Sequence, residues 1–171
     1  MNQHALVATP AAVPANQPCS YCYRHTVSFE ETNVVGNVYF TRHLSWQGRC
    51  RELFLREYAP EILDDLQRDL RLVTLNVSCE YFAELHALDD VEIRMWLVYL
   101  RQHRIKLGFD YLLEPCGSTL LIARGHQEIG CMRHTADGLV PTAVPHGLAA
   151  ALAEFDATRL YHERASGEVG V

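Results

Sequence analysis

The hydrophobic pattern that extends furthest along the chain has helical spacing and lies between residues 39 and 57. The stripe consists of Phe40, Leu44, Gln47, Gly48, Arg51 and Leu55, and is widened by Trp46, Cys50, Leu53 and Phe54. No proline interrupts this segment, and Pro60 is a stop signal. A glycine inside a helix costs about 1 kcal/mol relative to alanine, so Gly48 predicts close packing against the backbone there. We predict one long helix, from Tyr39 to Glu57, whose wide apolar face needs a sheet to cover it.

Alternating apolar and polar residues predict strands on both sides of this helix. The predicted strands are Tyr21–Phe29, Leu72–Phe82, Val91–Ile105, Lys106–Glu114 and Leu120–His134. In the second strand, the alternation predicts one face made by Val73, Leu75, Val77, Cys79 and Tyr81. Short helices are expected at residues 60–70 and 148–155, and turns at Cys116-Gly117-Ser118 and Asp137-Gly138. Strands joined by short turns are antiparallel, so the fold class is α+β, with a curved antiparallel sheet around a central helix.

Length and composition indicate one ordinary globular domain. The chain has 171 residues, of which 49% are hydrophobic and 21% charged, enough for a core without metal or disulfides. We expect this domain to span residues 19–158, after an Ala/Pro-rich disordered leader at 1–18 and before a polar tail at 159–171. The leader lacks the charge pattern of a signal peptide, and no window has 18 consecutive apolar residues. A cytoplasmic location, with no membrane contact, is therefore expected.

Charge and cysteine usage exclude several further classes. The formal net charge of −6 and the lack of a basic stripe argue against nucleic-acid binding. The six cysteines are scattered, and Cys50, Cys79 and Cys131 fall inside periodic segments, where a free cysteine behaves as a small hydrophobe. Cys19 and Cys22 form one CxxC pair without a second ligand pair at suitable spacing. We therefore expect neither a metal nor another cofactor.

The segment that opens the long helix carries a family resemblance. Its sequence runs from Glu31 through Asn33 and Gly36 to Phe40, as ETNVVGNVYF, and resembles hotdog-fold thioesterases of the 4-hydroxybenzoyl-CoA thioesterase type. This string, with LSWQGRCRE, LRLVTLNVSCEYFAELHALD and ARGHQE, is most similar to the acyl-carrier-protein thioesterases of enediyne polyketide (antibiotic) biosynthesis, over about 21–133. The resemblance implies a hotdog fold, a thioester hydrolase, and a homotetramer made of two hotdog dimers. It also implies an acyl carrier protein as partner, with a phosphopantetheine-linked polyene.

In the enediyne group an amide replaces the catalytic Asp of many hotdog thioesterases, and here the matching residue is Asn33. The resemblance implies that water hydrolyses a β-ketoacyl thioester without an acidic residue, giving a β-keto acid that can decarboxylate to a methyl ketone. We expect Asn33 to orient the thioester carbonyl or the water. Backbone N–H groups at Gly36, Asn37 and Val38 would stabilise the oxyanion, since a helix N-terminus favours negative charge.

Other side chains are candidates for substrate binding. Arg51 lies on the apolar helix face, where a planar cation could hold the β-keto oxygen or the carboxylate. Tyr39 and His43 lie one turn apart and could reach the pocket mouth. Glu84 is the rival to an acid-free mechanism, because some hotdog enzymes use a glutamate base. Arg101 and Arg104, which form one basic run with His103, could receive the pantetheine phosphate or the acidic carrier protein.

Two other functions stay open at this point. A hotdog dehydratase or hydratase needs an acid–base pair that includes His or Asp, and His43 is the nearby histidine. A non-catalytic acyl-binding module is allowed because Asn33, and not Asp, occupies the turn.

Overall fold

The computed structural model describes residues 19–114 and 118–156. The predicted leader, the predicted tail and residues 116–117 of the predicted turn lie outside these residues. The helices are α1 (Phe40–Tyr58), α2 (Pro60–Gln67) and α3 (His146–Ala153), with a 3-10 turn, η1, at Phe29–Glu31. The strands are β1 (Tyr21–Thr26), β2 (Leu70–Tyr81), β3 (Asp90–Arg101), β4 (Arg104–Leu113), β5 (Leu120–Thr135) and β6 (Gly138–Pro141).

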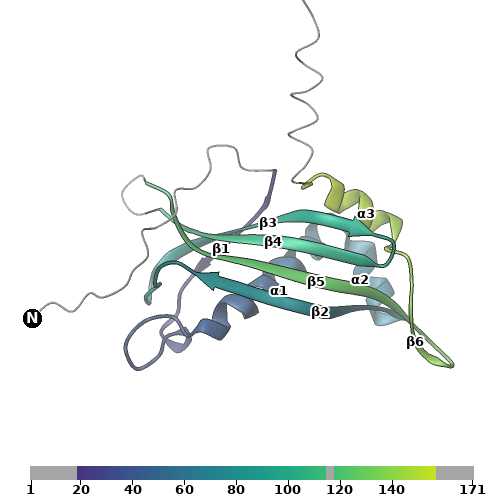
Figure 1. Ribbon diagram of the computed structural model, residues 1–171, viewed down its shortest axis with the longest axis horizontal. Coiled ribbons are helices and arrows are strands. Elements are labelled where there is room, and N and C mark those ends of the chain that lie inside the picture. Colours follow the sequence, from purple (N-terminus) through teal and green to yellow (C-terminus); the bar gives the residue numbers. More distant parts are fainter. Residues whose placement is uncertain (1–18, 115–117, 157–171) are drawn as a thin grey trace, which may run out of the picture.

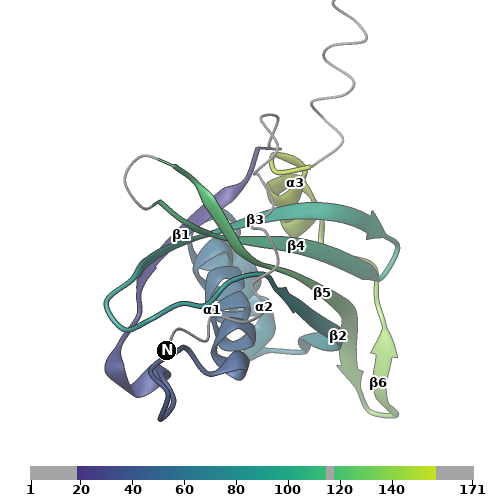
Figure 2. The ribbon, with the colours of Figure 1, turned by 60° about the vertical axis from the view of Figure 1, so that its left-hand side comes forward.

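Within the described residues, the strands form one antiparallel sheet in the order β1-β3-β4-β5-β2, and β6 pairs with the end of β5. The sheet is curved, and α1 and α2 lie along its concave side (Figures 1 and 2). The buried side of α1 consists of His43, Trp46, Gln47, Cys50, Phe54 and Leu55. The predicted α+β fold, a hotdog with a central helix, is confirmed.

Two details of α1 differ from the predicted stripe. Phe40, its expected first member, is 54% exposed, because the buried face begins at His43. Gly48 also has open space around it, since a Cβ built there has no neighbour within 4 Å. The close approach occurs opposite, at Gly125 of β5, where a Cβ would lie 2.0 Å from Nε2 of Gln47. Glycine in the sheet, and not Gly48, therefore lets helix and sheet approach.

Irregularities in the sheet correct two strand predictions. The β3–β4 hairpin turns at residues 102–103, so Arg104 begins β4 and the predicted strand to Ile105 is too long. In β2, the register shifts between Thr74 and Asn76. Such a bulge reverses the faces that follow it, so the predicted single face is wrong: Leu75 packs over Gly130, whereas Val77 lies opposite Gln127, which faces α1.

Of the three cysteines predicted to pack as small hydrophobes, Cys50 and Cys131 are fully buried, Cys79 is partly buried, and all three are free. Among the described residues, no group of three His, Cys, Asp or Glu side chains could hold a metal ion. No helix in that part of the chain is long and apolar enough to cross a membrane.

Candidate active site

The loop between η1 and α1 is a tight turn, closed by a bridge between Thr32 and Val38. Inside it, the Asn33 N–H donates to the Asn37 carbonyl at 2.9 Å, and the Gly36 N–H donates to the Asn33 carbonyl at 3.0 Å. Gly36 has φ +92°, a conformation that residues with a side chain rarely adopt. This requirement explains the glycine in the motif.

A chain of amide side chains links this turn to the segment after β2. Asn33 Nδ2 donates to Asn37 Oδ1 at 2.5 Å, and Asn37 Nδ2 donates to Glu84 Oε1 at 2.8 Å. The Val35 N–H donates to Asn33 Oδ1 at 2.9 Å. The structure therefore brings Asn33, Asn37 and Glu84 together, and the link through Asn37 was not predicted. Asn33 keeps a second N–H that is not used in this chain of bonds.

The predicted backbone donors are mostly engaged by the protein itself. The Gly36 N–H binds the Asn33 carbonyl, and the Val38 N–H binds the Leu85 carbonyl at 2.8 Å. The Tyr39 N–H donates to the Glu31 carbonyl at 2.9 Å. Among the described residues, the Asn37 N–H is the predicted donor without such a backbone bond.

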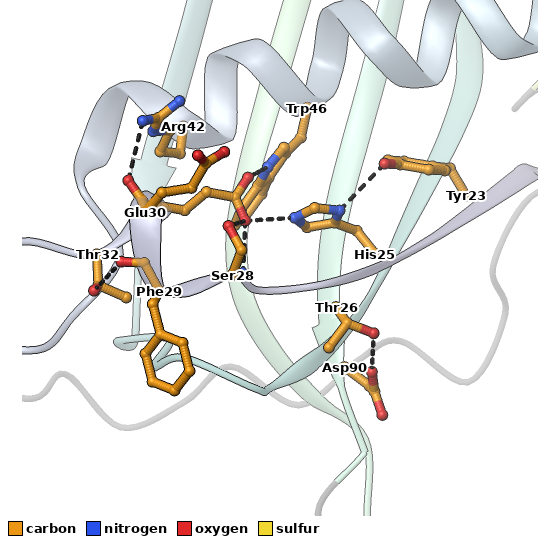
Figure 3. A network of polar contacts seen from close by, with 11 residues as sticks. Tyr23, His25, Thr26, Ser28, Phe29, Glu30, Thr32, Arg42, Trp46 and Asp90 are labelled. Carbon is orange, nitrogen blue, oxygen red and sulfur yellow. Dashed lines mark hydrogen bonds and ion pairs between the residues drawn. The ribbon is translucent and has the colours of Figure 1, made fainter.

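Glu31 anchors the turn to the helix and to β1. Its carboxylate accepts hydrogen bonds from Trp46 Nε1 at 2.7 Å, from His25 Nε2 at 2.8 Å and from the Ser28 N–H at 2.9 Å. His25 in turn contacts the Tyr23 hydroxyl at 3.3 Å, so these side chains converge between β1 and α1 (Figure 3). Burial alone would raise the pKa of Glu31, but the bonds from Ser28, Trp46 and His25 outweigh burial and lower it to about 2.

Three polar side chains, one helical turn apart, lie along the buried face of α1: His43, Gln47 and Arg51. Both ring nitrogens of His43, Oε1 of Gln47 and Nε of Arg51 are enclosed and have no hydrogen-bond partner. His43 is 3% exposed and is surrounded by the rings of Trp46, Tyr81 and Tyr111, and burial lowers its pKa to about 4. It is therefore neutral at pH 7. Unpaired buried polar atoms are rare, so this stripe is a candidate for contact with a ligand.

Arg51 reaches from α1 to the sheet. Its Nη1 donates to Oε1 of Gln127 in β5 at 2.9 Å. Among the described residues, no carboxylate forms an ion pair with Arg51. Burial lowers its pKa, but a guanidinium stays charged at any ordinary pH. Beside it is an apolar cavity of about 10 Å³, lined by Arg51, Phe54, Leu55, Leu72, Ile105, Leu107, Ile129, Leu148 and Leu152.

The remaining predicted residues separate into near and distant groups. Tyr39 is 48% exposed at the start of α1, and its ring packs on Phe40. Arg101 and Arg104 lie at the β3–β4 hairpin, at the opposite end of the sheet from the turn before α1 (Figure 1). Arg104 pairs with Glu128 at 2.8 Å. The structure does not bring these two arginines to the Asn33 turn of the same chain.

Sequence reasoning did not single out Gln127, the hydrogen-bond acceptor for Arg51 Nη1. Gln127 follows Gly125 and precedes Ile129 and Cys131 on the helix-facing side of β5. A polar residue at a position where the alternation requires an apolar one was the signal that could have found it.

Comparisons with known proteins agree with this geometry. The family model described as the thioesterase-like superfamily matches residues 27–152. The Dynemicin thioesterase is 46% identical with a TM-score of 0.78, and the match covers 80% of this chain and 97% of that chain. Crystal structures of that protein revealed induced-fit and allosteric effects upon polyene binding. No curated protein sequence matches this chain.

More distant structures share the fold. A 1,4-dihydroxy-2-naphthoyl-CoA thioesterase from Synechocystis is 20% identical with a TM-score of 0.67, covering 78% of this chain and 96% of that one. A mutant 4-hydroxybenzoyl-CoA thioesterase complexed with 4-hydroxybenzoyl-CoA is 12% identical with a TM-score of 0.70, covering 78% and 99%.

The Glu31 network predicts a specific acid sensitivity. Because the pKa falls from its ordinary 4.5 to about 2 on folding, the ionised carboxylate stabilises the protein above pH 4.5, and this contribution is lost as the pH falls toward 2. We expect it to amount to about 1–3 kcal/mol. Urea unfolding at pH 7 and at pH 3 should show that Glu31→Gln is less stable at pH 7 and has a weaker pH dependence. An unchanged pH dependence in the variant would contradict this role for Glu31.

Proposed function

The chain belongs to the thioesterase-like superfamily and is a thioester hydrolase with a hotdog fold, and we propose that it hydrolyses a β-ketoacyl polyene thioester. The acyl group would be carried by the phosphopantetheine arm of an acyl carrier protein in an enediyne polyketide synthase. The product would be a β-keto acid that can decarboxylate to a methyl ketone. The observation that carries this proposal is the Arg51 cation, which lies between helix and sheet without a carboxylate partner.

A half-buried cation without an opposite charge beside it is costly for a protein. Gln127 satisfies one N–H group of Arg51 but cannot compensate its charge, and Arg51 Nε has no partner. A ligand with a second oxygen, close to the thioester carbonyl and able to carry negative charge, would supply what is missing. A β-ketoacyl group has such an oxygen, whereas a simple acyl group does not.

The proposed reaction needs no carboxylate at the turn. A water molecule attacks the thioester carbonyl, and negative charge develops on the carbonyl oxygen, close to the partly negative β-keto oxygen. The second N–H of Asn33 and the Asn37 N–H of one subunit would stabilise the first oxygen, and Arg51 of the other subunit in a dimer would stabilise the second. Within one chain, Arg51 lies about 16 Å along α1 from Phe40, which is too far for the two oxygens of one β-ketoacyl group. The C–S bond then breaks, and the pantetheine thiolate takes up one proton of the attacking water. The other proton of that water is lost to solvent, which leaves the carboxylate of the β-keto acid.

With the β-keto oxygen at Arg51, the rest of the acyl chain would enter the apolar cavity beside that residue. A volume of about 10 Å³ barely holds one water molecule, so side chains must move apart when a polyene enters. Such a response is in line with the induced fit recorded for the Dynemicin thioesterase. Because Arg101 and Arg104 lie at the far end of the sheet, the pocket proposed here does not include them from the same chain.

The structure favours this function over the two alternatives. A dehydratase or hydratase needs an acid–base pair, but His43 is neutral at pH 7 and neither ring nitrogen meets an acidic side chain among the described residues. A non-catalytic acyl-binding module would not need the unpartnered Arg51. Glu84 stays a rival base, because it is exposed and linked to Asn33 through Asn37.

Arg51 should distinguish substrates with and without the β-keto oxygen. We expect Arg51→Ala to lower kcat/KM for β-ketoacyl thioesters by about 10- to 100-fold, the value of a hydrogen bond to a charged group, and to affect simple acyl thioesters much less. Arg51→Lys should recover part of the loss. Arg49→Ala, on an exposed position of the same helix, is the matched control. Equal losses on both substrate classes would show that Arg51 does not recognise the β-keto group.

Asn33 and Glu84 test whether the mechanism is free of acids. Asn33→Ala should cost about 2–4 kcal/mol of transition-state stabilisation, the scale of one oxyanion donor. Glu84→Gln keeps an oxygen acceptor for Asn37 Nδ2 and should change kcat little. If Glu84→Gln abolishes turnover while circular dichroism shows a folded protein, a carboxylate base is present and the acid-free mechanism is wrong.

We also propose that the chain forms a homotetramer built from dimers joined at β2. This twelve-residue strand is a sheet edge, and Val73, Leu75 and Val77 are 36–46% exposed on it. An open apolar edge is a liability unless another chain covers it. Sedimentation velocity should show the assembly, and Val77→Lys should weaken it more than Leu139→Lys on β6. A wild-type monomer at micromolar concentration would contradict the proposal.

A further inference from the structure

Gln127 has a position that the hydrolysis mechanism does not by itself explain. It is 5% exposed and lies on the helix-facing side of β5, directly opposite Val77 of β2. Its Oε1 is the acceptor for Arg51 Nη1, and within the described chain no other hydrogen bond of the Arg51 side chain is seen. The surroundings of this contact, beyond Gln127, are mainly apolar: Leu72, Ile105, Leu107 and Ile129.

We propose that Gln127 is a positioning residue that holds the Arg51 guanidinium in place without neutralising it. This inference rests on the proposed function of Arg51 as the group that meets the β-keto oxygen. An amide oxygen accepts a hydrogen bond as a carboxylate does, but it carries no net charge. The positive charge of Arg51 thus stays available to the substrate, while its direction is fixed by the sheet.

A carboxylate at the same position would act differently. It would have the shape of glutamine, but its charge would make the hydrogen bond to the guanidinium charge-assisted and allow a bidentate pair. Such a pair is much stronger than the present bond. Arg51 would then have its opposite charge inside the protein and would bind an anionic oxygen of the substrate weakly. The neutrality of Gln127, and not only its hydrogen bond, is therefore the property that sets substrate preference.

Gln47, one turn before Arg51 on α1, is also a neutral amide. Its Nε2 donates to the Ser78 carbonyl at 3.1 Å across the space left by Gly125, while its Oε1 has no partner. The hydrogen bond that orients the Arg51 cation is accepted by Gln127 on the sheet.

The experiment compares Gln127→Glu with wild type on β-ketooctanoyl and octanoyl thioesters of N-acetylcysteamine. We expect the ratio of the two kcat/KM values to fall about 10- to 100-fold, toward that of Arg51→Ala, while the melting temperature stays at or above that of wild type. Gln67→Glu, at an exposed position on α2, adds the same charge away from Arg51 and should leave the ratio unchanged. In the Arg51→Ala background, Gln127→Glu should not lower the ratio further.

The outcomes separate the two proposals. A wild-type enzyme that shows no preference for the β-ketoacyl thioester overturns the proposed function, and this inference with it. A wild-type preference that Gln127→Glu leaves unchanged, or equal losses on both substrates, overturns the inference alone. If Gln127→Glu does not fold, Gln127→Met removes the acceptor without adding charge, and it should lower the ratio by a smaller factor. An unchanged ratio in that variant overturns the inference as well.

Discussion

The structure depends on the burial of one helix in the concave side of a single sheet. Helix α1 contributes Trp46, Cys50 and Phe54 to the core, each at most 3% exposed. Such burial stabilises the fold through the apolar surface that it removes from water. It also removes polar side chains on the same face from water, and these need partners from the sheet or from a ligand. The site is a consequence of this second effect.

The entry to the helix is fixed by hydrogen bonds more than by apolar contact. Glu31 binds Trp46 of α1, His25 of β1 and the backbone of Ser28, so one carboxylate connects three successive parts of the chain. The Asn33 turn begins two residues later, and Gly36 gives it a backbone geometry that other residues rarely adopt. The position of the Asn33 amide is therefore set on one side by Glu31 and on the other by Asn37 and Glu84.

Between helix and sheet, a charged side chain lies beside a nearly closed apolar cavity. Arg51 meets a neutral acceptor, Gln127, and the cavity beside it has about 10 Å³. A rigid protein of this shape would exclude a long acyl chain. A helix held firmly at its first residues, but bordered further along by unpaired polar atoms and a small cavity, can yield at that part when a substrate supplies the missing contacts.

The sequence by itself determined the helices, strands β1 to β5 and their order, because periodicities of 3.6 and 2 reflect which faces a helix and a strand bury; the short strand β6 was not predicted. A local motif marked Asn33 and Gly36 as candidates, the resemblance added Glu84, and the helical stripe placed Arg51 on the side of α1 that meets the sheet. The sequence could not reveal the bulge in β2, since the alternation of residues 73–81 is regular and the register shift arises from pairing with β5. Nor could it reveal the contact between Arg51 and Gln127, which are 76 positions apart, or the open space around Gly48. These features were decided only by the tertiary structure, because the partner of a buried group is fixed by how strands and helix pack together, not by its neighbours along the chain.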